Sequence, residues 1–169
     1  MRTMENIIIE RGDLEKIYRS DHDLTLWRGL HIDEVNIKTN PLYPDLARKR
    51  LQNGKIREPD VEVYNSEVNG KQYVKSEEGK GTSVVNTDGM FGYKKWEYFI
   101  IPAGTPIRNR LIITKDHVIP RKKTKDNGPV WHYSISPNYD MPVTEFLDAL
   151  DELARDAGIR IQVRKHANS

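Results

Sequence analysis

The sequence contains no cysteine, which excludes disulfide bonds, thiol nucleophiles and thiolate metal sites. Long hydrophobic runs are also missing. Ile7–Ile9 is too short for a classical signal peptide, and no later segment is apolar enough to span a membrane. The formal net charge is only +2, so no overall field attracts nucleic acid. We therefore expect no membrane contact, and any export would need a machine that does not read classical signals.

Length and composition fit one folded domain. A chain of 169 residues is close to the usual size of a single domain and buries about 70 % of its unfolded surface. Polar and apolar residues alternate through many short segments, with the clearest helical pattern near the C-terminal end. We predict a single α+β domain over residues 1–169, with a mostly antiparallel sheet and flanking helices. Residues 1–20 are expected to be a short helical extension.

The first half is predicted from apolar spacing and turn residues. Leu24, Leu26, Arg28 and Leu30 alternate along one face of a strand. The dipeptide Asn69-Gly70 favours a hairpin turn. The predicted elements are a helix over Asp13–Arg19, a strand over Leu24–Leu30, a helix over Pro44–Leu51 stopped by Asn53-Gly54, and a hairpin joining Val61–Tyr64 to Lys71–Val74.

The second half is more regular. Its clearest helix has apolar residues at i, i+3, i+4 and i+7, with Pro142 near its start and Gly158 after its end. The predicted elements are strands at Val84-Val85, Tyr98–Ile101, Arg110–Thr114, Ile119 and Val130–Ser136, a charged loop over Arg121–Gly128, the helix Val143–Ala157, and a last strand over Ile159–Val163.

Gly79–Val85 is a glycine-rich turn that leads into a β-branched strand. Glycine allows a close backbone approach or a positive φ angle, and the strand fixes where the next side chains point. Thr82 and Ser83 place two hydroxyl groups at the mouth of this strand, each able to donate and accept hydrogen bonds. This pattern is more typical of a site that holds a ribose or a carboxamide than of a core.

Two further side chains are candidates for chemistry. Arg28 is a permanent cation on an otherwise leucine-bearing face, and its planar fork suits a phosphate. The alternative for Arg28 is a structural ion pair or a solvent-facing register, since buried arginines are more often paired than ligand-binding. His132 lies between Trp131 and Tyr133, where it could bind a ribose hydroxyl or shuttle a proton. The alternative for His132 is a hydrogen-bonded structural histidine.

One basic run, Arg121, Lys122, Lys123 and Lys125, stands out among the charged residues. It is expected to be either a solvated hairpin tip or a patch that follows the phosphates of RNA or DNA. Stacking of bases would need aromatic side chains such as Trp131, Tyr133 or Tyr93 nearby. No histidine pair has ligand spacing, so we expect no metal site.

The chain resembles a known family through several short blocks in order. The blocks are Leu24–Gly29, Arg57–Val61, Gly81–Val84, Phe99–Thr105 and His132–Ile135. They are similar to blocks of a type VI secretion effector family of ADP-ribosyltransferase-like cytoplasmic toxins. The likeness extends over about Leu24 to Ile159. It implies a split, mostly antiparallel sheet that encloses NAD.

The resemblance also implies roles for individual residues. Arg28 would fix the phosphates or the nicotinamide-side ribose, and the backbone of Gly29 would contact the carboxamide. Thr82 and Ser83 would bind the nicotinamide ribose. His132 would take the third motif position, and Arg57 would be an auxiliary phosphate-binding or positioning residue. Thr82, Ser83 and His132 are thereby the expected catalytic residues. Transferases of this fold use a glutamate to stabilise the cationic sugar, and none stands beside His132. Glu145 or another acid would have to reach the site, or the mechanism lacks that carboxylate.

The function expected from this resemblance is a toxin that binds NAD and transfers ADP-ribose to a macromolecule or hydrolyses NAD. The resemblance also implies a cognate immunity protein and a possible secretion carrier. It implies delivery without a signal peptide and action in the target-cell cytoplasm. Two alternatives remain open. One is a metal-independent endoribonuclease toxin that uses His132 or His31 with the basic run, and the other is a non-catalytic binding module.

Overall fold

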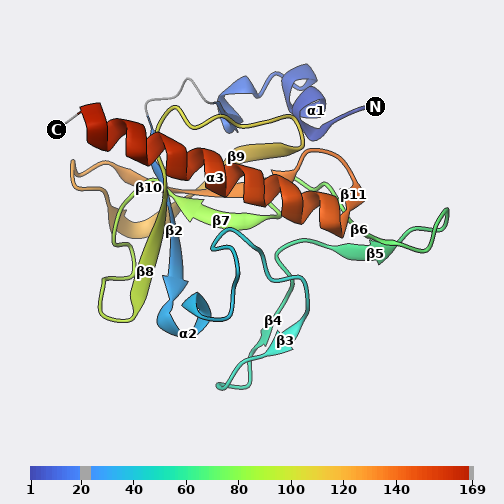
Figure 1. The fold of residues 1–169 in the computed structure, drawn as a ribbon, viewed down its shortest axis with the longest axis horizontal. Coiled ribbons are helices and arrows are strands. Elements are labelled where there is room, and N and C mark those ends of the chain that lie inside the picture. Colours follow the sequence, from blue (N-terminus) through green and yellow to red (C-terminus); the bar gives the residue numbers. More distant parts are fainter. Residues whose placement is uncertain (20–23, 168–169) are drawn as a thin grey trace.

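The computed structural model describes residues 1–19 and 24–167, and a six-stranded sheet forms its centre (Figure 1). All its neighbouring strands are antiparallel. Across the sheet the strands are β1 (Ile17–Tyr18), β9 (Leu111–Lys123), β10 (Pro129–Pro137), β7 (Thr82–Val85), β2 (Leu26–His31) and β8 (Trp96–Ile101).

Smaller elements surround this sheet. The second sheet consists of β11 (Met141–Pro142), β6 (Gln72–Val74) and β5 (Val63–Asn65), and the third is a hairpin of β3 (Lys49–Arg50) and β4 (Ile56–Arg57). The helices are α1 (Met4–Glu10), α2 (Ile32–Val35) and α3 (Val143–Ala167), with one 3-10 turn, η1 (Leu14–Lys16). The predicted α+β class with mostly antiparallel strands is confirmed.

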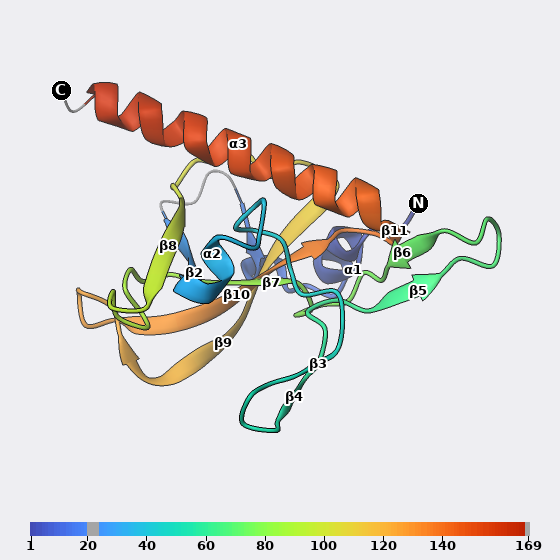
Figure 2. The ribbon, with the colours of Figure 1, turned by 60° about the horizontal axis from the view of Figure 1, so that its bottom comes forward.

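The main core lies between α3 and one face of the large sheet, as Figure 2 shows from the side. The apolar stripe of α3 contains Phe146, Leu150 and Leu153, each at most 3 % exposed. They share a cluster with Ile113 of β9 and Ile135 of β10. Burial of each such side chain stabilises the fold by about 1.5–3 kcal/mol, so this layer holds the sheet rigid.

The opposite face of the sheet is covered by α1 at one end. There α1 packs its buried Met4 and Ile8 against Ile17 of β1 and Ile112 of β9. A capping box starts this helix, because the Thr3 side chain accepts a hydrogen bond from the Asn6 backbone while the Asn6 side chain accepts one from Thr3. The predicted N-terminal extension is thus built into the sheet, and the other end of this face is left for a cavity.

The sheet is split between β2 and β7. β2 pairs with β8 at six positions but meets β7 at one, Trp27 opposite Val85. Along β2 the side chains alternate between buried and half-buried, which confirms that Leu26, Arg28 and Leu30 share one face. Because the two strands diverge beyond Trp27, a long side chain from the core face can reach through the gap.

Both the predicted hairpin and the predicted C-terminal helix are present, although the helix is longer than expected. β5 and β6 pair across the turn that contains Gly70, whose φ angle is 69°. α3 begins at Val143 as predicted but continues past Gly158 to Ala167, so the predicted strand over Ile159–Val163 is wrong. A helical glycine costs only about 1 kcal/mol. Continuing the helix lets Arg160 donate a hydrogen bond to the Ala103 carbonyl.

The predicted helix over Pro44–Leu51 is also wrong. Instead of bonding within a helix, the Asp45 backbone N–H donates to the Asp60 carboxylate, and the Asp45 carbonyl accepts from the Asp60 N–H. Asn53-Gly54 does reverse the chain, but between β3 and β4, with a φ angle of 81° at Gly54. The segment lacks the buried stripe that a helix needs, so tertiary contacts decide its conformation.

Asp13–Arg19 forms one 3-10 turn and β1, rather than the predicted helix. Ile17 and Tyr18 are buried and pair with Thr114 and Ile113 of β9, and this pairing outweighs the local helical pattern. In the second half, β9 runs to Lys123, so the charged segment supplies three strand residues before its turn at residues 124–128. In the described part of the chain, no helix has the length and apolar character that crossing a membrane requires.

Candidate active site

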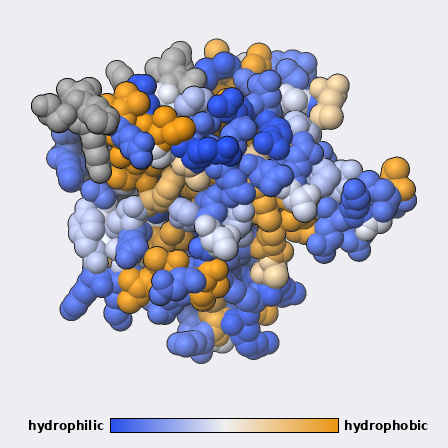
Figure 3. All heavy atoms as spheres, viewed as in Figure 1, coloured by the Kyte–Doolittle hydropathy of each residue, from blue (hydrophilic) through white to orange (hydrophobic). Residues whose placement is uncertain are grey.

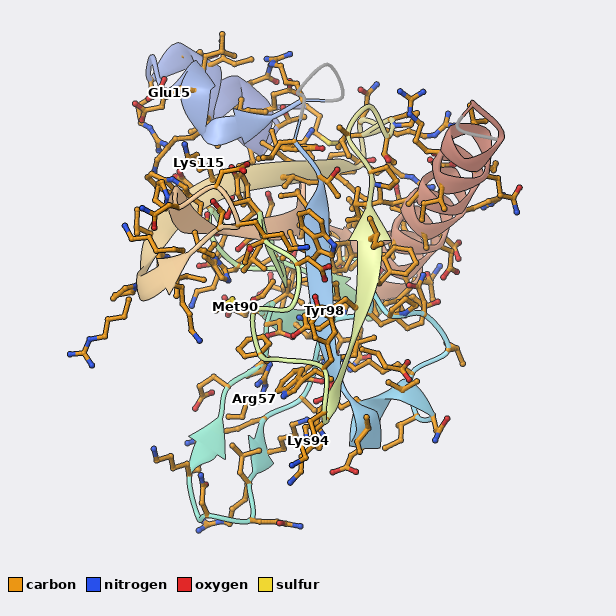
Figure 4. The ribbon with its side chains drawn as sticks, turned by 90° about the vertical axis from the view of Figure 1, so that its left-hand side faces the viewer. Glu15, Arg57, Met90, Lys94, Tyr98 and Lys115 are labelled. Carbon is orange, nitrogen blue, oxygen red and sulfur yellow. The ribbon has the colours of Figure 1, made fainter. Side chains whose placement is uncertain are left out.

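A cavity of about 270 Å³ opens beside the split in the sheet. Its polar lining comes from Arg28, Glu34, Arg57, Ser83 and His132. Its apolar lining includes Trp27, Val85, Met90, Phe91, Trp96 and Tyr98. Figure 4 looks onto this part of the molecule, with Met90 and Tyr98 beside β2 and Arg57 below them. Charged and aromatic groups therefore meet in one pocket, as in many small-molecule sites.

Arg28 brings a buried positive charge to the cavity. The residue is 7 % exposed, and its Nη1 donates to the Ser83 carbonyl at 3.1 Å through the gap between β2 and β7. Its Nε has no hydrogen-bond partner, and Arg28 makes no ion pair among the residues that the structure describes. Burial lowers the pKa of Arg28, and the negative charges of Asp60 and Glu34 offset this only in part. The structural ion pair that the sequence left open is not formed there, and an anionic ligand would fit.

Ser83 and His132 lie together on the cavity face. Antiparallel pairing places Ser83 opposite Ser134, two residues from His132 on the same face of β10. His132 Nε2 lies 2.9 Å from Ser83 Oγ, and His132 Nδ1 lies 2.9 Å from the carboxylate of Asp116. This hydroxyl, imidazole and carboxylate form a continuous chain of hydrogen bonds that ends at the cavity.

Thr82, expected at the same site, does not line the cavity. Its hydroxyl donates to the Leu42 carbonyl at 2.6 Å on the opposite, core-facing side of β7, and the residue is fully buried. The physical reason is the two-residue period of a strand, which sends consecutive side chains to opposite faces. Of the paired hydroxyls, only that of Ser83 can face a ligand.

Gly29 is needed for a close approach, but by an aromatic ring of the chain itself. A Cβ at this position would lie 3.1 and 3.2 Å from ring carbons of Phe91. Phe91 stacks on Trp96 with ring centroids 4.4 Å apart. Its backbone N–H donates to the Tyr98 hydroxyl, which donates to the Gly92 carbonyl. These contacts fix a flat aromatic wall over the strand that carries Arg28.

Arg57 stands at the rim of the cavity with its charge already paired. Its Nε lies 2.9 Å from the Asp45 carboxylate, and its Nη2 lies 3.6 Å from that of Asp60. The side chain remains 44 % exposed. A second cation therefore faces the cavity mouth, held in place by two acids but still open to a ligand.

Two acidic residues at the site were missed by the sequence reasoning. Glu34 of α2 lines the cavity, whereas Glu145 does not and instead accepts a hydrogen bond from Tyr139. Asp116 reaches His132 from β9. Asp116 is the one acidic residue of β9, and this was the available signal for it. Its partner depends on strand register, which the sequence alone does not show.

The basic run lies at the exposed tip of the β9–β10 hairpin. Lys122 Nζ donates to the Met90 carbonyl at 3.5 Å, which links the hairpin to the loop that lines the cavity. Of the expected stacking aromatics, Tyr133 is buried and Trp131 lies under Lys115 Nζ, 4.0 Å from its ring centre. Tyr93 is 66 % exposed and remains available.

His31, the other histidine considered for catalysis, serves as the N-cap of α2. Its Nδ1 accepts a hydrogen bond from the Asp33 backbone, and its ring meets the edge of Trp96. Among the described side chains, those of residues 1–19 and 24–163, no three histidine or acidic groups gather as a metal ion would require.

Comparison with known proteins places the chain in a family. The sequence model of the family described as Tse2 ADP-ribosyltransferase toxin matches residues 8–160, which is most of the chain. The matched segment contains Arg28, Arg57, Ser83, Asp116 and His132. No curated protein matches the sequence.

Proposed function

Because the chain belongs to the Tse2 ADP-ribosyltransferase toxins, and is therefore an NAD-dependent ADP-ribosyltransferase, we propose that it binds NAD in the cavity beside the split of the sheet. The observation that carries this proposal is the buried Arg28, whose charge faces the cavity without a carboxylate partner among the described residues. A buried cation is costly unless an anion compensates it, and the pyrophosphate of NAD supplies two negative charges.

The lining residues suggest how NAD would lie. Arg28 would bind the pyrophosphate, and Arg57 would contact it from the rim as an auxiliary cation. The aromatic wall of Phe91 and Trp96 would flank the nicotinamide ring, and the backbone of Gly29 would contact the carboxamide at the edge of this wall. The nicotinamide ribose would then reach Ser83 and, through it, His132.

The reaction needs little covalent help from the protein. Cleavage of the bond between ribose and nicotinamide builds positive charge on the sugar, as in glycoside hydrolysis. The cavity would hold the sugar, stabilise the developing charge and limit the access of water. We propose that the acceptor of ADP-ribose is a macromolecule, with water as the competing acceptor.

We also propose that the toxin acts in the cytoplasm of a target cell, where NAD is abundant. A producing cell would then need a cognate immunity protein that blocks the cavity or its rim. Delivery by a type VI secretion machine, with or without a carrier protein, is consistent with family membership.

The proposal is tested by incubating the protein, made by cell-free synthesis, with NAD labelled in the nicotinamide. We expect nicotinamide release that falls at least about 100-fold in the variants Arg28→Ala, Ser83→Ala and His132→Ala. Arg50→Ala is the matched control, because Arg50 is an exposed arginine outside the cavity. Three folded variants that each keep full activity and toxicity would refute the site.

The basic hairpin favours a second candidate, cleavage of RNA with His132 as the base. Arg121, Lys123 and Lys125 are exposed, and Lys122 ties the hairpin to the cavity loop. Cleavage of RNA by the purified protein in the absence of NAD, lost in His132→Ala, would favour this candidate over ADP-ribosyl transfer.

A further inference from the structure

Asp116 is a mostly buried carboxylate that holds three hydrogen bonds at the floor of the site. Its Oδ1 accepts from the Thr114 hydroxyl at 2.9 Å. Its Oδ2 accepts from the Ser134 hydroxyl at 2.7 Å and lies 2.9 Å from His132 Nδ1. Burial alone would raise the pKa of Asp116, but the hydrogen bonds from His132, Ser134 and Thr114 outweigh it and hold this pKa below its usual range. The side chain is therefore an anion near neutral pH.

A β-bulge in β9 brings Asp116 to this position. Tyr133 pairs with Lys115 and His132 pairs with His117, so Asp116 is an extra residue without a partner in β10. Two β9 side chains consequently face His132, with Asp116 hydrogen-bonded to the ring and His117 stacked on it at 4.8 Å between centroids. Bulges commonly redirect a side chain next to an active site, and here the bulge breaks the longest ladder of the sheet to do so.

The positions of the protons follow from these contacts. An ionised Asp116 can only accept, so a His132 ring with a single proton carries that proton on Nδ1. His132 Nε2 is then an acceptor, and the Ser83 hydroxyl must donate to it. With its proton turned toward His132, Ser83 Oγ presents only lone pairs to the cavity.

We propose that Asp116 is a positioning residue, and that the chain Asp116–His132–Ser83 makes Ser83 Oγ an obligate hydrogen-bond acceptor for a hydroxyl of the nicotinamide ribose. This inference rests on the proposed binding of NAD. It explains how the site operates without a glutamate beside His132. Asp116 keeps its negative charge and fixes the tautomer and orientation of the imidazole, so that Ser83 Oγ takes over the contact that a carboxylate would make.

The step it assists is heterolytic. The bond between C1 of the ribose and the nicotinamide nitrogen breaks, the electron pair stays with the nicotinamide, and neutral nicotinamide leaves. The ribose becomes an oxocarbenium-like cation, and an oxygen of the acceptor then bonds to C1 and releases its proton to solvent. A hydrogen bond from the ribose hydroxyl to Ser83 strengthens as this cation forms, so it lowers the barrier. Ser83 forms no bond to carbon.

The test replaces the carboxylate by its amide. In Asp116→Asn the new NH₂ group would donate to His132 Nδ1, which forces the ring proton to Nε2 and turns Ser83 into a donor toward the cavity. The same exchange of an orienting aspartate severely slows serine proteases through the wrong histidine tautomer. We expect kcat for nicotinamide release to fall at least about 100-fold, with KM for NAD changed less than about threefold.

Nitrogen-15 NMR of the histidine ring, recorded without NAD, provides a readout that a merely structural role would not move. The wild-type ring is expected to carry its proton on Nδ1, and the Asp116→Asn ring on Nε2. In a His132→Ala background, Asp116→Asn is expected to lower kcat little further, because the two residues act as one unit. Asp140→Asn is the matched control, since the Asp140 carboxylate accepts hydrogen bonds from Tyr64 and Ser76 but lies beside β5 and outside the cavity.

Several results would overturn the inference. Wild-type protein with the ring proton on Nε2 would refute the proposed chain Asp116–His132–Ser83 directly. A folded Asp116→Asn variant that keeps its kcat would refute it as well. Loss of activity in Glu34→Gln with Asp116→Asn unaffected would assign the carboxylate role to Glu34. A covalent ADP-ribosyl group on Ser83 during turnover would show that Ser83 attacks carbon instead. The expected tautomer with no release of nicotinamide would refute the NAD proposal and the ribose contact with it.

Discussion

At the scale of single residues, Arg28 is the side chain whose surroundings are hardest to explain without a ligand. It lies on the face of β2 that carries Leu26 and Leu30, yet its guanidinium crosses the split and reaches the cavity. Its hydrogen bond to the Ser83 carbonyl satisfies one of five donors. A charge held in this way costs folding free energy that a bound anion would return.

Replacing Arg28 by methionine separates these two effects. We expect Arg28→Met to raise the free energy of unfolding by about 1 kcal/mol or leave it unchanged, because an apolar side chain of similar length removes the buried charge. Affinity for NAD is expected to fall at least about tenfold. Urea denaturation and fluorescence titration with NAD measure the two quantities. A large loss of stability with NAD affinity intact would mean that Arg28 is a structural residue.

Asp116 should leave a signature in the pH dependence of stability. The folded-state pKa of Asp116 lies below its usual range, so its contribution is present above the unfolded pKa of about 3.9 and is lost as pH falls through the folded pKa. We expect Asp116→Asn to be less stable than wild type by about 1–2 kcal/mol near neutral pH. This difference should shrink below about pH 4. Urea denaturation across the acid range checks it, and a difference independent of pH would contradict it.

At the scale of elements, the parts that could be predicted are those whose pattern is local. Phe146 and Leu150 mark α3 by helical spacing, and Asn69-Gly70 marks a hairpin by its turn chemistry. The helices predicted over Pro44–Leu51 and Asp13–Arg19 are wrong. Hydrogen bonds between Asp45 and Asp60 decide the conformation of the first segment, and pairing with β9 decides that of the second. Local propensity is a weak guide where such long-range contacts compete.

The site divides along the same line. Arg28, Ser83 and His132 were recognised from blocks in the sequence, and the fold brings them to one cavity. Asp116 was not recognised, because its contact with His132 depends on the register between β9 and β10 and on a bulge within it. Thr82 was assigned to the site because the sequence did not show which face of β7 its side chain would point to. Register is a property of paired strands, and no single segment encodes it.

Replacing each of two glycines by alanine should change the stability of the protein in opposite directions. A Cβ at Gly81 would lie 2.0 Å from the Ile135 carbonyl oxygen of β10, a backbone atom that cannot move without breaking the pairing with β7. We expect Gly81→Ala to destabilise the protein by about 3 kcal/mol. Gly158 is helical with nothing within 4 Å of its Cβ position, so Gly158→Ala should stabilise by about 0.5–1 kcal/mol.

Thermal denaturation of both variants, followed by circular dichroism, measures these effects. The pair controls for the general effect of glycine replacement on the unfolded chain, because the substitution is the same at both sites. A destabilised Gly158→Ala variant would indicate that the helix ends there, as the sequence pattern suggested. A fully stable Gly81→Ala variant would contradict the close contact between β7 and β10.

At the scale of the whole molecule, the two faces of the large sheet have different tasks. The face under α3 is a packed core, and hydrophilic residues cover most of the outer surface on that side, with hydrophobic patches between them (Figure 3). The other face carries α1 at one end and the cavity beside the split. The basic hairpin forms the exposed end of β9 and β10, and Lys122 joins it to the cavity loop. A net charge of +2 therefore conceals a local concentration of positive charge.

This arrangement favours the hairpin as a docking surface for an acidic acceptor such as nucleic acid. In the variant with Arg121→Gln, Lys123→Gln and Lys125→Gln, the exposed charges are removed while the contact of Lys122 with Met90 is kept. We expect modification of the acceptor to fall at least about tenfold more than release of nicotinamide, since the NAD cavity keeps its lining. The salt dependence of modification should weaken as well, because fewer counterions are released on docking.

The matched control removes the same number of charges elsewhere, through Lys55→Gln, Lys71→Gln and Lys80→Gln, all exposed and outside the cavity. Incubation with labelled NAD and cell lysate, with nicotinamide and labelled macromolecules measured in the same sample, gives both rates at once. Both triple variants lose the same total charge. If the hairpin docks the acceptor, modification of the acceptor should therefore fall only in the hairpin variant. Equal losses in the two variants would mean that acceptors respond only to net charge, and a proportional loss of both rates in the hairpin variant would place the hairpin in NAD turnover itself.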